Sequence, residues 1–203
     1  MTIMDNNKLI NQSVFKFFLL VFALSMPFWM LGFITTDTTK LLPIKLPIAA
    51  LMSICPLLAA VMLVYKKRKI EGVKELLKIA FDFKKINNKK WYVPIILLMP
   101  VIAVLSYLYI KMTGAILSES SISPSSLFVF FLVYFIGAIG EEVGWSGYII
   151  NPLQNKYGAL KASTIIGITW AVWHIIPYDQ AHQTTGWIVW QYIGTVCLRI
   201  IMV

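Results

Sequence analysis

Two adjacent carboxylates and one imidazole are the residues of this sequence whose types are best suited to chemistry. Glu141 and Glu142 interrupt one long apolar stretch, and His174 interrupts the next. A carboxylate in hydrocarbon is costly unless it is protonated, paired or hydrated, so ionisable residues in such stretches face protein or a watery cavity. A carboxylate and an imidazole at one depth can hold and deprotonate a water molecule. The chemistry that these residues could perform is therefore hydrolysis.

The same residue types are compatible with two other roles. In the first, Glu141 and Glu142 satisfy backbone or hydroxyl groups in a kinked, glycine-rich helix, and His174 is an ordinary buried histidine. In the second, the carboxylates take part in proton or ion transport across the bilayer. Residue types alone leave both alternatives open beside hydrolysis.

Two successive membrane-spanning helices must position these residues. At about 1.5 Å per residue, Glu141 lies roughly 15 Å from the inner end of a helix that stops at Asn151. By the same measure, His174 lies roughly 18 Å from the inner end of a helix that starts at Ala162. The two residues therefore reach similar depth on antiparallel neighbours. We expect a polar cavity between these helices that opens to the inner side.

Glycines form a row beside the glutamates. On a helical projection they share one face, which Glu141 borders: Gly137, Gly140, Gly144 and Gly147. Small residues on one face permit close approach of a second helix, so Glu141 is directed toward protein. Glu142 projects about 100° further round, and the position four residues later holds Ser146 instead of a cation. Glu142 therefore needs a cation from elsewhere, or stays protonated.

The composition predicts a single all-α, polytopic membrane domain over residues 1–203. Of 203 residues, 59% are apolar and only 13% are charged, which is unlike a soluble domain. The apolar stretches are too long for buried strands and suit helical spans. A Ser-rich link over residues 118–126 is predicted to be a loop. We expect six spans, at about residues 14–34, 47–65, 91–113, 127–150, 162–178 and 187–203.

The positive charge is concentrated next to predicted spans. Ten of the eighteen Lys and Arg residues lie between Lys66 and Lys90, which indicates a topology signal and a contact for anionic lipid headgroups. With the N-terminus on the cytoplasmic side of the cell membrane, fourteen basic residues fall inside and three outside. Residues 70–81 have the periodicity of an amphipathic helix on the membrane surface. No aromatic-basic surface domain is present, so no nucleic-acid partner is expected.

Two short motifs resemble those of a known family. The run from Glu141 to Tyr148, EEVGWSGY, resembles the first motif of the CPBP family of intramembrane proteases, which is E-E-x-x-x-R. That family includes CAAX prenyl endopeptidases and bacteriocin-processing or immunity proteins. The run from Trp170 to His174, WAVWH, resembles the second motif, F-x-x-x-H, with Trp in place of Phe, and the spacing of about thirty residues also fits. The resemblance covers roughly residues 127–203.

The resemblance implies an intramembrane endopeptidase and a role for each residue. Glu141 would activate the attacking water, His174 would assist it, and Glu142 would support them. Glu141 and His174 would also be the ligands of a divalent metal such as zinc, if the family chemistry uses one. The implied partners are the lipid bilayer and a peptide or membrane-protein substrate, prenylated or bacteriocin-like.

Two departures from the family pattern favour an alternative. Ser146 stands where the family has Arg, so the partner that would hold Glu142 ionised is missing. The third family motif, a His followed four residues later by Asn or Asp, has no counterpart before Val203, so we expect the natural protein to continue. The alternative is a degenerate, non-catalytic protein of bacteriocin immunity or a membrane scaffold.

The remaining candidates receive structural interpretations. His182 is expected to be a solvated loop histidine. The tryptophans nearest the motifs, Trp145, Trp170 and Trp173, are expected to be packing residues, although Trp170 could wall a pocket. Arg199 is expected either to snorkel to the inner interface, which is the favoured interpretation, or to donate a charge to the site. The two cysteines lie far apart in apolar stretches and support neither a disulfide framework nor a thiolate metal cluster.

Overall fold

The protein is helical throughout the part of the chain that the structure describes. The computed structural model describes residues 3–34, 48–81, 87–114, 124–181 and 184–202, and these residues contain no strand. A backbone in hydrocarbon finds no water to bond, so a helix, which pairs its own N–H and C=O groups, is the form that long apolar stretches adopt. The predicted all-α polytopic class is confirmed.

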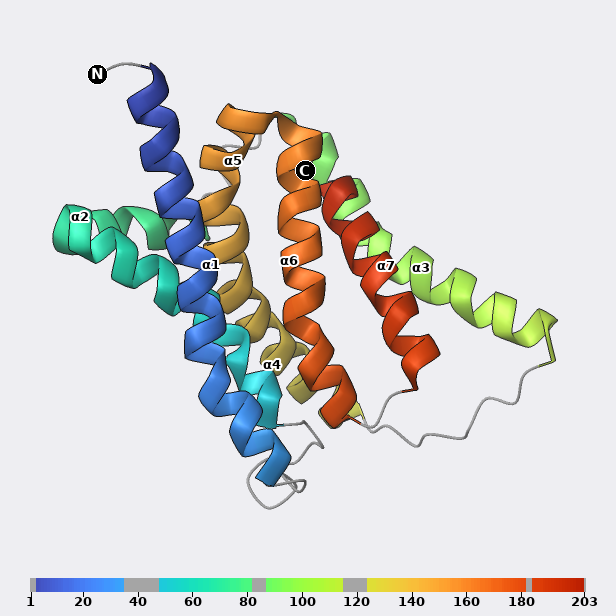
Figure 1. The fold of residues 1–203 in the computed structure, drawn as a ribbon. Coiled ribbons are helices and arrows are strands. Elements are labelled where there is room, and N and C mark those ends of the chain that lie inside the picture. Colours follow the sequence, from blue (N-terminus) through green and yellow to red (C-terminus); the bar gives the residue numbers. More distant parts are fainter. Residues whose placement is uncertain (1–2, 35–47, 82–86, 115–123, 182–183, 203) are drawn as a thin grey trace.

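Figure 1 shows the arrangement of the described helices. In chain order they are α1 (Ile3–Ile34), the 3-10 helix η1 (Ile48–Ile54), α2 (Cys55–Ile79), the 3-10 helix η3 (Lys89–Trp91), α3 (Tyr92–Met112), α4 (Pro124–Glu142), the π-helix η4 (Val143–Ile149), α5 (Ile150–Tyr157), α6 (Ala159–Gln180) and α7 (Thr185–Met202).

The core lies where α1, η4 and α6 meet. Phe17, Trp145 and Trp173 have no exposed surface. Their rings meet edge to face, with centroids 5.3 Å apart for Phe17 and Trp145 and 5.9 Å apart for Trp145 and Trp173. The indole N–H of Trp173 donates to Ser25 Oγ at 2.8 Å, which joins α6 to α1. The packing interpretation of Trp145 and Trp173 is confirmed.

The glycine row beside the glutamates packs against the start of α2. A Cβ on Gly144 would lie 2.6 Å from the backbone of Pro56, and one on Gly140 would lie 2.8 Å from the carbonyl oxygen of Ser53. Neither position has room for a side chain, so the predicted close approach is confirmed there. At Gly147 the nearest atom would be 3.8 Å away, so this glycine does not contribute. The helix that approaches is η1–α2.

Helix α2 bends sharply at Lys69, where φ is 51° and ψ is −149°. The bend gives the two arms seen at the left of Figure 1 and falls where the sequence predicts the end of the second span. The second arm carries the predicted amphipathic pattern and buries Val73 and Leu76. Its position on a membrane surface stays a prediction.

The prediction that the helix of the fourth span stops at Asn151 and Pro152 is wrong, whereas the bounds of the membrane span itself stay a prediction. The chain stays helical through η4 and α5 as far as Tyr157 and turns only at Gly158, where φ is 78°. Pro152 lies in α5 directly after the widened turns of η4, and the helix continues past it. The loop predicted over residues 118–126 is wrong at its end, because residues 124–126 are the first turn of α4.

Four helical segments are long and apolar enough to cross a membrane, by length and composition, within the described ranges. They are Ser13–Ile34, Ile48–Ile79, Lys89–Met112 and Ala159–Gln180. The helices in the predicted spans 127–150 and 187–203 are not among these four, so the total of six spans stays a prediction.

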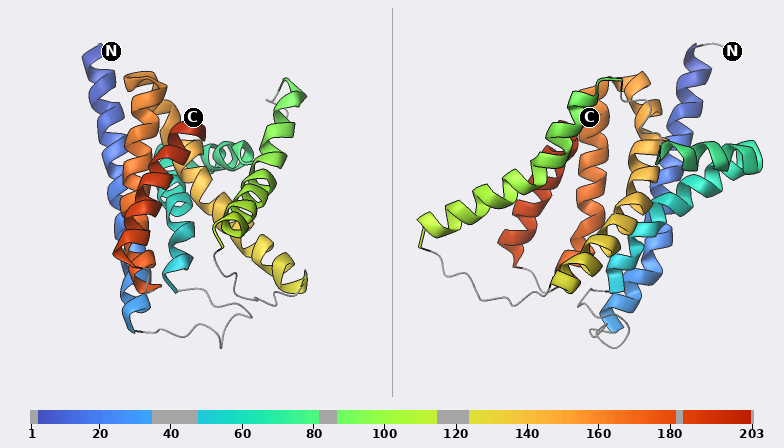
Figure 2. Two further views of the ribbon diagram at one scale, coloured as in Figure 1. Left: turned by 90° about the vertical axis from the view of Figure 1, so that its right-hand side faces the viewer. Right: turned by 180° about the vertical axis from the view of Figure 1, so that it is seen from behind.

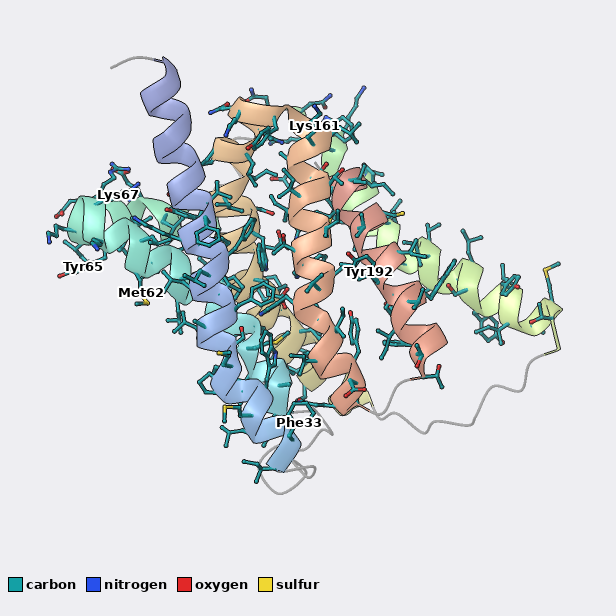
Figure 3. All side chains as sticks on the ribbon, viewed as in Figure 1. Phe33, Met62, Tyr65, Lys67, Lys161 and Tyr192 are labelled. Carbon is teal, nitrogen blue, oxygen red and sulfur yellow. The ribbon has the colours of Figure 1, made fainter. Side chains whose placement is uncertain are left out.

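The bundle has two distinct ends and one diverging helix. In Figure 3, Lys161 lies at the upper end of α6 and Lys67 near the bend of α2, whereas Phe33 lies at the lower end of α1. The assignment of one end of the bundle to the inner side stays a prediction. Helix α3 diverges from the other helices (Figure 2), and 0% of its apolar window is buried.

Candidate active site

Glu141, at the end of α4, and His174, on α6, face each other. His174 Nε2 lies 4.0 Å from Glu141 Oε2, and only 17% and 16% of the two side chains are exposed. The juxtaposition expected from matched depth on antiparallel helices is therefore confirmed. The distance is too long for a direct hydrogen bond, but two polar atoms at this separation can share one small molecule between them.

Trp170 holds both members of this pair. Its indole N–H donates to Glu141 Oε2 at 2.7 Å. Its backbone carbonyl lies 2.9 Å from His174 Nδ1, one helical turn further along α6. Because a carbonyl oxygen can only accept, Nδ1 carries the proton in this bond. Nε2 of a neutral ring is then unprotonated and presents its lone pair toward Glu141.

Aromatic rings fix the plane of the His174 imidazole. Trp173 meets it edge to face with centroids 4.8 Å apart, and Tyr178 stacks on it at 5.6 Å. Trp173 is itself fully buried and bonded to Ser25 of α1. The orientation of His174 is therefore set by the packing of α6 and α1 as well as by Trp170.

The second glutamate is paired with Arg199 of α7. Arg199 Nη2 donates to Glu142 Oε1 at 2.8 Å, and Nη1 donates to Glu142 Oε2 at 3.0 Å. Ser146 Oγ donates to the same carboxylate and accepts from Arg199 Nη1 at 3.1 Å. The cation that Glu142 was predicted to need thus comes from another helix.

The predicted snorkelling of Arg199 is wrong. Its side chain is 1% exposed and is fully enclosed by the protein. Snorkelling requires a path to water, and here the guanidinium finds a carboxylate within the bundle instead, in the bidentate geometry that Arg favours.

Gly167 lets α7 come close enough for this contact. A Cβ on Gly167 of α6 would lie 3.2 Å from the Cα of Val196 and 3.3 Å from the Cβ of Arg199. These separations are tighter than ordinary contacts, so the absence of a side chain at Gly167 sets the spacing between α6 and α7 at the level of the ion pair.

The two pairs are connected through one ring. The Arg199 guanidinium carbon lies 4.4 Å from the centroid of Trp170, whose N–H holds Glu141. A cation over an indole face is attracted by the ring. Trp170 therefore does more than pack: it contacts the ion pair on one side and the Glu141–His174 pair on the other.

Sequence reasoning offered Arg199 as a charge donor to the site but did not predict its pairing with Glu142, and it missed the π-helix η4. The ion pair joins residues 57 apart, so no local spacing predicts it. The available signal was a lone charged residue in the apolar stretch after Trp187. Helix η4 begins directly after Glu142, and such widened turns are frequent at functional sites.

The donor set offers limited support for the expected metal. Glu141 and His174 could each supply one ligand, but no group of three His, Cys, Asp or Glu side chains occurs within the described ranges. A catalytic zinc site takes three protein ligands, so these two residues alone do not fit one. His182, the other histidine, lies outside the described residues.

An apolar groove of about 290 Å³ opens beside the second glutamate. Its walls come from α2, α4 and η4, and it includes Glu142 and Ser146 but not Glu141 or His174. The carboxylate of Glu142 is thus accessible from this groove. The polar cavity expected between α4 and α6 stays a prediction.

Comparison with known proteins identifies relatives. Residues 123–203 match the family model described as type II CAAX prenyl endopeptidase Rce1-like. Over 180 residues the chain is 32% identical to CAAX prenyl protease 2 of Methanococcus maripaludis, and the alignment covers 82% of this chain and 64% of that protein. The chain therefore spans less than two thirds of that relative's length. The matched region contains Glu141, Glu142, His174 and Arg199.

Proposed function

Because the chain belongs to the CAAX protease (CPBP) family, we propose that it is an intramembrane endopeptidase that hydrolyses a peptide bond with water activated by Glu141 and His174. The observation that carries this proposal is the 4.0 Å separation of Glu141 Oε2 and His174 Nε2 in a nearly buried site. Glu142 supports the pair from the neighbouring position.

The two facing atoms suit a shared water molecule. A carboxylate oxygen and an unprotonated imidazole nitrogen are both acceptors, and each can accept from one water at about 2.8 Å. A water held by Glu141 and His174 would use both its protons in these bonds and direct a lone pair outward. That lone pair is the nucleophile that the reaction needs.

The bond changes follow from these roles. Glu141 takes a proton from the water while the oxygen of that water attacks the peptide carbonyl carbon, and a new C–O bond forms. When the C–N bond breaks, that proton passes to the departing nitrogen, so a carboxylic acid and an amine result. His174 orients the water through Nε2. Glu141 and His174 would supply two of the three protein ligands that a catalytic zinc takes, and no third His, Cys, Asp or Glu joins them within the described residues.

The setting of the reaction is part of the proposal. We place residues 1–203 in the cell membrane as one multi-spanning domain with the N-terminus on the cytoplasmic side, as the basic residues favour. The relative is named a prenyl protease, so a peptide segment carrying a prenyl group is the first substrate to test. An unprenylated, bacteriocin-like peptide is the second.

A cleavage assay tests the proposal. The assay uses membranes that contain the full-length protein. Glu141→Gln keeps the size of the side chain and an acceptor for the Trp170 N–H but removes the base. We expect it and His174→Ala to lower turnover by at least about 100-fold, measured by mass spectrometry of prenylated and unprenylated peptides. Glu75→Gln is the matched control, because Glu75 is 56% exposed on α2, and it should retain full turnover.

Wild-type turnover in both site variants, above the background of protein-free membranes, would overturn the endopeptidase proposal. The non-catalytic immunity or scaffold role would then gain support if Glu141→Gln protected cells from a bacteriocin as well as the wild type. Transport would gain support instead if liposomes showed a proton or ion flux that this substitution abolished.

A further inference from the structure

We propose that Arg199 is a positioning residue for the Glu141–His174 pair and that it supplies, from α7, a cation that could equally be supplied from position 146. This inference rests on the proposed endopeptidase function. Within the part of the chain that the structure describes, no hydrogen bond or ion pair joins Arg199 to Glu141 or His174. It acts through Glu142 and Trp170.

The burial of Arg199 fixes where it must be. A guanidinium that is 1% exposed cannot be stable without a counter-charge, and the carboxylate of Glu142 provides one through two hydrogen bonds of 2.8 and 3.0 Å. The forked geometry permits only a narrow range of positions for the two groups. The pair therefore sets the register of α7 against the junction of α4 and η4, one residue after Glu141.

The ring of Trp170 carries this constraint to the reacting groups. The guanidinium carbon of Arg199 lies 4.4 Å from the ring centroid, and the N–H of the same ring lies 2.7 Å from Glu141 Oε2. A shift of Arg199 therefore moves the ring that holds Glu141. Misplacement of a catalytic group by about 1 Å can cost roughly 100-fold in rate.

Position 146 offers a second place for the same charge. Ser146 lies one helical turn after Glu142, and its hydroxyl already contacts both the Glu142 carboxylate and Arg199 Nη1, the latter at 3.1 Å. Ser146 is exposed to the groove beside Glu142, so a longer side chain has space there. An arginine at this position could reach the same carboxylate from within its own helix.

Relocation of the charge is the experiment. Arg199→Leu removes the cation, and we expect kcat for peptide cleavage to fall about 10- to 100-fold with KM nearly unchanged, because the alignment of the Glu141–His174 pair is lost. Ser146→Arg combined with Arg199→Leu should recover most of the lost kcat. Arg199→Lys should be intermediate, since an ammonium keeps the charge but not the fork.

The matched control is Arg68→Leu, which removes an arginine that is 60% exposed and paired with Glu75 on α2. It should leave kcat unchanged. Full activity of Arg199→Leu would overturn the inference, and so would a Ser146→Arg, Arg199→Leu variant that is as inactive as Arg199→Leu alone. Either result leaves the endopeptidase proposal standing as long as Glu141→Gln loses activity. If Arg199→Leu fails to fold, the same comparison is made between Arg199→Lys and the double variant, whose melting temperature reports the restored pair.

Discussion

Two arginine–glutamate pairs in this protein have nearly the same separation and opposite surroundings. Arg68 and Glu75 lie 2.6 Å apart across the bend of α2, with 60% and 56% of their side chains exposed. Arg199 and Glu142 lie 2.8 Å apart between α7 and the end of α4, with 1% and 33% exposed. By distance alone the exposed pair would be the stronger.

The surroundings reverse that order. An exposed pair gains little, because water and salt screen both charges and two long side chains must be immobilised. In the enclosed pair, the guanidinium of Arg199 would be stranded in a poor solvent without Glu142, and Glu142, which is 33% exposed, would keep only partial contact with solvent without Arg199, so each one depends on its partner. The enclosed pair therefore fixes the position of α7 against the other helices. The exposed pair does not produce the bend of α2, which comes from the backbone conformation at Lys69.

Removal of one partner should give the largest difference between the pairs. We expect Arg199→Leu to lower the free energy of unfolding in detergent by about 3 kcal/mol, since Glu142 remains without its cation and is only partly exposed. Removing both charges with Glu142→Leu and Arg199→Leu should cost less than the single change. Thermal and denaturant unfolding measure the stability of the single and the double variant. A double variant less stable than Arg199→Leu would contradict the conclusion that each charge depends on its partner.

The same contrast explains what sequence could predict. Glu141 and His174 were brought together by counting residues along two antiparallel helices, which needs only local geometry. Arg199 could not be placed that way, because its partner lies 57 residues away on a helix that is not its neighbour in sequence. A single charged residue in an apolar stretch indicated that Arg199 has a function. Whether its guanidinium reaches water or pairs with a buried carboxylate depends on how the helices pack, which the sequence does not give.

Helix ends were the other failure, for a related reason. Pro152 is a strong signal for the end of a helix, yet the chain continues to Tyr157 because η4 changes the helical pattern just before it. The bend at Lys69 was predictable, since a cluster of four basic residues follows the apolar stretch there. Long apolar patterns thus predicted the helices, whereas local backbone changes decided where they stop.

A smaller effect should appear when the spacing around the enclosed pair is changed without touching a charge. Gly167→Ala places a Cβ 3.2 Å from the Cα of Val196, so α7 must move outward, and we expect a loss of about 1–3 kcal/mol in unfolding free energy. Gly194→Ala on α7 is the matched control, because an added Cβ there meets no atom within 4 Å. It should be neutral or stabilising. Equal stabilities of the two variants would show that the α6–α7 spacing is not set at Gly167.

The smallest effect is expected at the exposed pair. Arg68→Leu should change the unfolding free energy by no more than about 0.5–1 kcal/mol, and a double-mutant cycle with Glu75→Gln should give a coupling of about 0.2–1 kcal/mol that disappears at high salt. The bend at Lys69 should persist, because its backbone conformation does not depend on that bond. A coupling as large as that of Arg199 and Glu142 would contradict this expectation and would mean that the second arm of α2 is shielded from water.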